Sequence, residues 1–109
     1  GDGILGEYGV QAILSDPELM AAGDLHVMCA NDPVAAWGAC ELYRSRWNRR
    51  LDVICGPATD NAVGRDFIER SLNVPAINAR LEYERLGSFV FSKLFGRPEP
   101  AATPVKEIA

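Results

Sequence analysis

The sequence predicts an α/β fold built on a parallel sheet. Three short apolar runs, at residues 25–30, 51–55 and 74–77, have the length and composition of buried strands. Each run leads into a polar loop and then into a stretch with helical spacing of apolar residues. A repeated strand–loop–helix unit is typical of parallel sheets with right-handed crossovers, so we expect a three-layer, Rossmann-like arrangement.

The chain opens with a helical segment that has no strand before it. Residues 7–14 carry apolar side chains at helical spacing, and a Ser-Asp-Pro sequence at 15–17 ends the pattern. Before this helix, the sequence Gly-Asp-Gly at 1–3 is typical of a loop that follows a strand. Three strands with four helices would leave apolar faces uncovered. The sequence therefore indicates a fragment, a processed subunit or an obligate oligomer.

The first strand–helix junction is the most informative one. The strand at 25–30 ends at Asn31, and a helix is predicted from Pro33 to Trp47. Asp32 is a strong N-cap type, and proline suits the first helical position. Open α/β sheets bind ligands beyond the carboxyl ends of their strands, so Asn31 and Asp32 are candidate ligand-binding residues. The local alternative makes Asn31 a turn residue and Asp32 a helix cap.

The second junction adds three polar side chains. The strand at 51–55 leads into a loop that ends with Thr59, Asp60 and Asn61. A helix is predicted from 61 to 72, so one of these three residues is expected to cap it and another can face a ligand. The apolar face of this helix is predicted to consist of Val63, Phe67, Ile68 and Leu72.

The third junction completes the edge. The strand at 74–77 leads to Asn78 and Arg80, and a last helix is predicted at 82–95. Arg80 can pair with a carboxylate or phosphate, or with Glu84 four residues further along the chain. The apolar face of the last helix is predicted to consist of Tyr83, Leu86, Val90 and Leu94.

Composition limits the function classes. The 109 residues suffice for one domain, which we expect at 1–96, followed by a Pro-rich tail at 97–109 that can add an edge strand. The net charge of −4 argues against non-specific nucleic-acid binding, and no apolar run reaches the roughly 20 residues that span a bilayer. No targeting segment is recognisable. We expect neither a nucleic acid nor a membrane as partner.

The cysteines and the basic residues carry weaker signals. Cys29, Cys40 and Cys55 are predicted to be buried free thiols, which favours a reducing, cytoplasmic location. Their spacing does not suit a metal site, and glycine-rich phosphate-binding motifs are missing, so no metal or cofactor is expected. A basic cluster at the end of the first long helix is interpreted as solvated, with a phosphate or acidic partner as the alternative. Its members are Arg44, Arg46, Arg49 and Arg50.

Four short motifs follow one another in an order found in one known family. They are Gly-Asp at 1–2 with the helix at 6–14, Cys-Ala-Asn-Asp at 29–32 with Ala-Trp-Gly-Ala at 36–39, Asp-Val-Ile-Cys-Gly at 52–56, and Pro-Ala-Ile-Asn at 75–78 with Glu-Arg-Leu-Gly at 84–87. Together they resemble the carboxyl-terminal part of the lac-repressor/galactose-repressor family and of type I periplasmic sugar-binding proteins. The loop at 56–60 departs from the family's Gly-aromatic-Asp-Asp pattern, so the family's ligand-binding aspartate corresponds most closely to Asp60.

The resemblance implies a periplasmic-binding-protein-like lobe of a transcriptional regulator or solute-binding protein. Such a lobe binds a sugar or another small polar metabolite, and this one lacks the part that reads DNA. The candidate ligand-binding residues are Asp2, Asn31, Asp32, Thr59, Asp60, Asn61, Asn78 and Arg80.

Two other classes of function stay open. The first is a subunit of an α/β enzyme in which Asp32, Asp60 and Arg80 act on a small carboxylate or phosphate. The second is a scaffold whose loops are only capped turns. His26 lies within a strand and has no visible nucleophile as a partner, so we expect a packing role and lean against catalysis. A homo-oligomer or a missing partner subunit is expected in each case.

Overall fold

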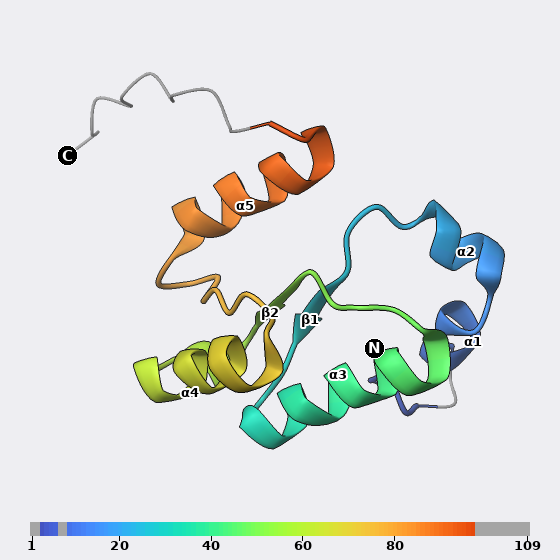
Figure 1. Cartoon of the computed structure of the whole chain (residues 1–109), viewed down its shortest axis with the longest axis horizontal. Coiled ribbons are helices and arrows are strands. Elements are labelled where there is room, and N and C mark those ends of the chain that lie inside the picture. The colour runs from blue at the N-terminus through green and yellow to red at the C-terminus, as the bar shows by residue number, and fades with distance from the viewer. Residues whose placement is uncertain (1–2, 7–8, 98–109) are drawn as a thin grey trace.

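A computed structural model describes residues 3–6 and 9–97 of the chain. Two parallel strands lie at its centre, with helices on both sides of them (Figure 1). This arrangement confirms the α/β class. The elements in chain order are α1 (Val10–Leu14), α2 (Pro17–Ala22), β1 (Val27–Cys29), α3 (Pro33–Trp47), β2 (Val53–Cys55), η1 (Pro57–Thr59), α4 (Ala62–Phe67), η2 (Ile68–Leu72) and α5 (Tyr83–Phe95).

The sheet is smaller than the sequence predicts. In β1 and β2, Val27 pairs with Val53 and Cys29 with Cys55, both in parallel register. The third predicted strand, 74–77, joins β2 through one residue pair only, because it contains a proline. The carbonyl of Pro75 accepts a hydrogen bond from Ile54. Pro75 has no N–H to donate, so the ladder does not extend along this segment.

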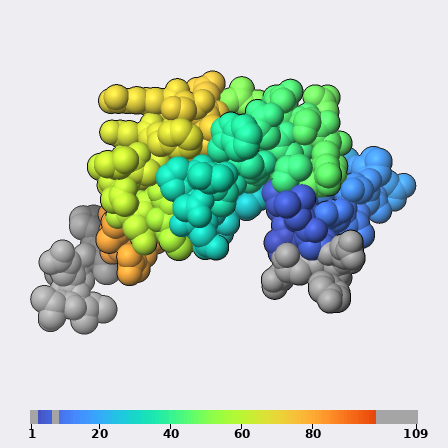
Figure 2. Space-filling view, turned by 90° about the horizontal axis from the view of Figure 1, so that it is seen from below, coloured from blue at the N-terminus to red at the C-terminus, as the bar shows by residue number. Residues whose placement is uncertain are grey.

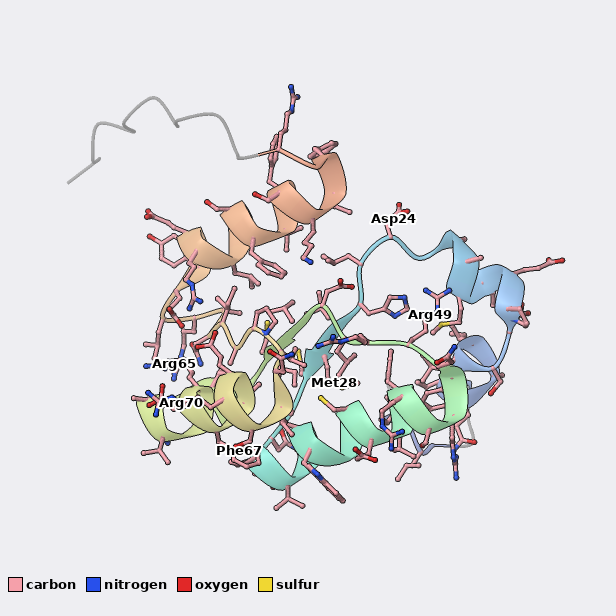
Figure 3. The ribbon with its side chains drawn as sticks, in the orientation of Figure 1. Asp24, Met28, Arg49, Arg65, Phe67 and Arg70 are labelled. Atoms are coloured by element: carbon pink, nitrogen blue, oxygen red, sulfur yellow. The ribbon has the colours of Figure 1, made fainter. Side chains whose placement is uncertain are left out.

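The main apolar core lies between the sheet and the helices α3 and η2. Ala36, Ala39 and Tyr43 of α3 are buried at helical spacing and belong to the same cluster as Ile54 and Ile68. The side chain of Met28 also enters this cluster, between β1 and α3 (Figure 3). Figure 2 shows α3 beside α4 and η2 on this side of the molecule.

A smaller apolar cluster lies on the other side of the sheet. Val53, Cys55 and Ile77 are buried there beneath Leu86 and Phe89 of α5. No residue of α5 is itself buried. The predicted apolar face of this helix was therefore only partly right. Tyr83 and Leu94 are exposed, whereas Leu86 and Val90 are partly buried as predicted. Phe89, which the pattern missed, packs against the cluster together with Leu86.

Side-chain caps fix where three helices begin. Asp32 accepts a hydrogen bond from the N–H of Ala35 at 2.8 Å, and α3 has the bounds that the sequence predicts. Asn61 caps α4 through the N–H of Gly64 at 2.9 Å. The predicted helix at 61–72 is present as α4 followed by a π-helical turn, η2, and of its predicted apolar face Val63 is exposed.

The third cap begins α2, a helix that the sequence pattern did not predict. Asp16 accepts hydrogen bonds from the N–H groups of Glu18 and Leu19, and Pro17 occupies the first position of α2. The Ser-Asp-Pro sequence at 15–17 therefore ends α1 and starts α2. Of the predicted helix at 7–14, residues 9–14 are described and helical from Val10.

The cysteines differ in exposure. Cys55 is buried, Cys40 is partly buried and Cys29 is exposed, so the prediction of three buried thiols was wrong for Cys29. The reason is that α5 covers the β2 side chains, while Val27 and Cys29 of β1 stay exposed. All three thiols are free. Among the helices of residues 3–6 and 9–97, none has the length and apolar character needed to cross a membrane.

Candidate functional site

Three polar loops meet at the carboxyl edge of the sheet. The first two are held together by the backbone: the N–H of Ala58 donates to the carbonyl of Ala30 at 2.9 Å, and the N–H of Ala30 donates to the carbonyl of Cys55 at 3.0 Å. Gly56 has a φ of 89°, which favours glycine. A Cβ at this position would lie 2.7 Å from the carbonyl oxygen of Ala30. Gly56 is thus what lets the two loops approach so closely.

Asn78 joins the second loop to the third. Its amide nitrogen donates to Thr59 Oγ1 at 3.0 Å and to Asp60 Oδ1 at 2.8 Å. Its amide oxygen accepts hydrogen bonds from the N–H groups of Arg80 at 3.1 Å and Leu81 at 2.8 Å. The side chain is buried and both ends of the amide are engaged, so Asn78 organises the edge rather than offering free groups to a ligand.

Thr59 has a similar internal role. It is fully buried, and its hydroxyl donates to the carbonyl of Gly56 at 2.7 Å. Its own carbonyl accepts a hydrogen bond from Arg65 Nη1 at 2.7 Å. Figure 3 shows Arg65 extending from α4 toward the segment that precedes α5, where its Nε lies 3.8 Å from Glu82 Oε1. Thr59 therefore anchors the loop beneath the exposed residues.

Glu82 belongs to the same network and was not among the predicted site residues. Its Oε1 accepts a hydrogen bond from the N–H of Asn78 at 3.2 Å, and its Oε2 accepts one from Arg85 Nη1 at 3.0 Å. Two hydrogen bonds lower the pKa of Glu82 from its ordinary value of 4.5. The one from the backbone of Asn78 has the larger effect, and the one from the Arg85 side chain has the smaller effect. The signal available in the sequence was a carboxylate at the predicted start of the last helix.

Asp60 and Arg80 are the exposed charged pair of the edge. Arg80 Nη2 lies 3.7 Å from Asp60 Oδ1, so Arg80 pairs with Asp60 and not with Glu84. Asp60, Asn78 and Arg80 line a shallow hollow of about 310 Å³ together with Gly56, Pro57 and Ala79. Both charged side chains are open to solvent and accessible to a polar ligand.

Asn31, Asp32 and Asn61 line a second hollow of about 400 Å³. Pro57 lines both hollows, so the two adjoin. Each capping side chain uses one atom for its helix: Asp32 uses Oδ1 and Asn61 uses Oδ1. Asp32 Oδ2, Asn61 Nδ2 and the exposed amide of Asn31 have no hydrogen-bond partner within the part of the chain that the structure describes.

The structure thus brings the predicted residues to one edge and divides them by role. Thr59 and Asn78 form its buried support. Asn31, Asp32, Asp60, Asn61 and Arg80 are exposed on it. Asp2 lies outside the described residues.

Another cavity lies away from this edge and was not predicted. It measures about 640 Å³ and is lined by residues of α3, η2 and the segments that follow them, together with Phe67 at the end of α4. Trp37 and Phe67 are among its apolar members. Arg44, Arg49 and Arg50 of the basic cluster also line it. Arg44 Nη2 donates a hydrogen bond to Glu41 Oε2 at 2.7 Å, and Arg50 Nη2 donates one to the carbonyl of Asn73 at 3.0 Å.

His26 takes part in packing. Its ring contacts the ring of Tyr43 edge-on, with 5.8 Å between the ring centroids. Within the described residues, no group of three or more His, Cys, Asp or Glu side chains could hold a metal ion.

Comparison with protein-family models, curated proteins and solved structures finds no match for the chain. The resemblance to sugar-binding regulators therefore stays a prediction that rests on the motifs.

Proposed function

We propose that this chain is a binding lobe for a sugar or another small polar metabolite, of the kind found in transcriptional regulators and solute-binding proteins. The observation that supports this is the convergence of three loops on two adjoining hollows at the carboxyl edge of the sheet. Because the buried hydrogen bonds of Thr59 and Asn78 hold the edge together, the exposed groups are positioned before a ligand arrives.

The free groups suit a ligand rich in hydroxyls. Asn31 and the amide nitrogen of Asn61 donate, Asp32 Oδ2 and Asp60 accept, and Arg80 adds a positive charge at one end. A polyol or sugar ring presents alternating donors and acceptors, which match this mixture better than an apolar ligand does. Each hydrogen bond to a charged partner contributes about 1.5–3 kcal/mol when water is excluded.

The hollows are shallow, so the proposed site needs a second wall to exclude water. A further segment or a partner subunit, including a second copy of the chain, would supply it and would complete the three-layer, periplasmic-binding-protein-like lobe. Closure of the two walls over the ligand is a well-attested way for such lobes to respond to it. A cytoplasmic regulator without direct DNA contact by this segment is the setting that we propose.

The test is a thermal-shift screen of the purified chain against sugars, nucleosides, polyols and small carboxylates. Stabilisation by one class is expected, since a ligand that binds only the folded state raises the melting temperature. Asn31→Ala and Asp60→Ala should each weaken that binding by about 1–3 kcal/mol. Asp24→Ala removes an exposed carboxylate elsewhere and should leave affinity unchanged. Equal affinity in all three variants would place the ligand outside this edge.

A second candidate is an enzyme subunit acting on a small carboxylate or phosphate. The observation in its favour is that Arg80 reaches Asp60 only at 3.7 Å and is otherwise free to bind an anion. In that case Arg80→Ala should abolish stabilisation by carboxylates or phosphates, and the bound compound should be converted. Stabilisation by a sugar without conversion would reject the enzyme and support the binding lobe.

A further inference from the structure

Two cysteines face each other across the parallel strands. Cys29 and Cys55 are register partners, each at the end of its strand. Neighbouring strands lie about 4.8 Å apart, and disulfides join residues whose Cα atoms are roughly 4.4–6.8 Å apart. The register therefore holds the two backbones within the range that a disulfide requires.

The two side chains also leave the same face of the sheet. Cys55 belongs to the apolar cluster beneath α5, on the face opposite to Ile54. Met28 lies in the cluster on the α3 side, so its neighbour Cys29 points to the α5 side. Cys29 is exposed and Cys55 is buried. Burial raises the pKa of the Cys55 thiol, and the adjacent Cys29 raises it further.

We propose that Cys29 and Cys55 are an oxidisable thiol pair that a small disulfide, such as oxidised glutathione, closes into a cross-strand disulfide. In the first step the thiolate of Cys29 attacks one sulfur of the small disulfide, forms a mixed disulfide and releases one small thiol. In the second step the thiolate of Cys55 attacks the sulfur of Cys29 and releases the second small thiol. Two protein thiols are oxidised, one small disulfide is reduced, and two small thiols leave.

The assignment of roles follows from exposure. Cys29 is the exposed thiol of the pair, so an oxidant in solution reaches it before the buried Cys55, which is its register partner. Cys40 lies on α3, on the other side of the sheet, and its pKa is raised by burial and by the neighbouring Glu41. The closed pair would tie together the strand ends that lead through Ala30 to Asn31 and directly into Gly56. Oxidation would then stiffen the base of the candidate site whether or not a ligand is bound.

The experiment titrates the folded, reduced chain with oxidised and reduced glutathione, quenches with acid, alkylates the remaining thiols and measures the mass. The expected product has lost two of its three alkylatable thiols and yields a peptide pair linked through Cys29 and Cys55. Cys40→Ser is the matched control and should give the same cross-link. Cys29→Ser replaces an exposed side chain, should leave the fold intact, and should abolish the reaction.

Two results would overturn the proposal. One is a wild-type product that stops at the mixed disulfide on Cys29 even at a large excess of oxidised over reduced glutathione. The other is cross-linking between chains to the same extent in wild type and in Cys55→Ala. Because the readout is a covalent bond, neither result depends on the ligand proposed for the edge.

Discussion

Asn78 is the residue on which the polar edge depends most. Its amide makes four hydrogen bonds, to Thr59, Asp60, Arg80 and Leu81. Asn78→Ala would leave the Thr59 hydroxyl and two backbone N–H groups without this partner, and each buried group left unpaired costs about 1–3 kcal/mol. We expect the free energy of unfolding, measured by urea denaturation, to fall by about 2–4 kcal/mol.

Asn31→Ala is the matched comparison for Asn78. Asn31 lies on the same edge but is exposed, so its replacement should change stability by less than about 0.5 kcal/mol. A loss as large as that of Asn78→Ala would mean that Asn31 supports the fold. A neutral Asn78→Ala would contradict the role assigned to the buried network.

Two glycines should respond to alanine in opposite directions. Gly56 has a positive φ and no room for a Cβ against Ala30, so Gly56→Ala should destabilise the chain by more than about 1 kcal/mol. Gly87 lies within α5 and has no atom near the position of a Cβ. Gly87→Ala should therefore stabilise the chain by about 0.5–1 kcal/mol. Thermal unfolding of both variants checks the pair. A Gly56→Ala variant as stable as the wild type would contradict the close approach at Gly56, and a loss of stability in Gly87→Ala would contradict the open space at Gly87.

At the scale of the elements, the cap of α3 tests whether Asp32 serves the fold. Asp32→Ala removes the hydrogen bond to Ala35 and should cost about 1 kcal/mol of stability, whereas Asp32→Asn keeps a capping oxygen and should cost only a few tenths. Urea denaturation measures both changes. If the asparagine variant keeps its stability and loses ligand binding, Asp32 Oδ2 contributes to the site. Equal stability losses in the two variants would show that charge, not capping, holds the helix start.

The elements also show what a single sequence can predict. The Asp-Pro pair at 32–33 predicted the start of α3 correctly, because the helix that begins at Pro33 has fifteen residues and a long enough apolar pattern. The same pair at 16–17 was not recognised as a helix start. The reason is that α2 has only six residues, too few to show a helical spacing of apolar side chains. The strand predicted at 74–77 is longer than the single residue pair that forms. Its apolar composition is typical of a strand, but Pro75 has no N–H to donate to the ladder.

The candidate site was predicted in position but not in detail. Strand ends and loop composition were enough to locate the edge. Which side chains turn inward was beyond the pattern, because Thr59 and Asn78 are 19 residues apart in the chain and meet only in the fold. The role of Glu82 likewise depends on a hydrogen bond from the backbone N–H of Asn78, which no local sequence motif predicts.

At the scale of the whole molecule, the two sides of the sheet differ in how well they are covered. The α3 side holds the large core, whereas the α5 side holds a small one (Figure 1). Val27, Leu94 and Phe95 are exposed apolar side chains, of which Val27 belongs to the strand that α5 leaves open. Exposed apolar side chains of this kind are the reason why a further segment or a partner subunit belongs to the proposed function.

The stability of the whole chain should depend on pH through Glu82. Because the pKa of Glu82 is lower in the folded state than in the unfolded state, its carboxylate stabilises the fold at pH values above its ordinary pKa of 4.5. That contribution is lost as the pH falls through the lowered, folded-state pKa. Glu82→Gln should therefore lower stability at neutral pH and make the free energy of unfolding depend less on pH, as measured by urea denaturation between pH 7 and pH 3.

Glu84→Gln makes the same charge change in the first turn of α5 without removing the hydrogen bonds from Asn78 and Arg85. If both variants responded alike, overall charge rather than the Glu82 network would account for the effect.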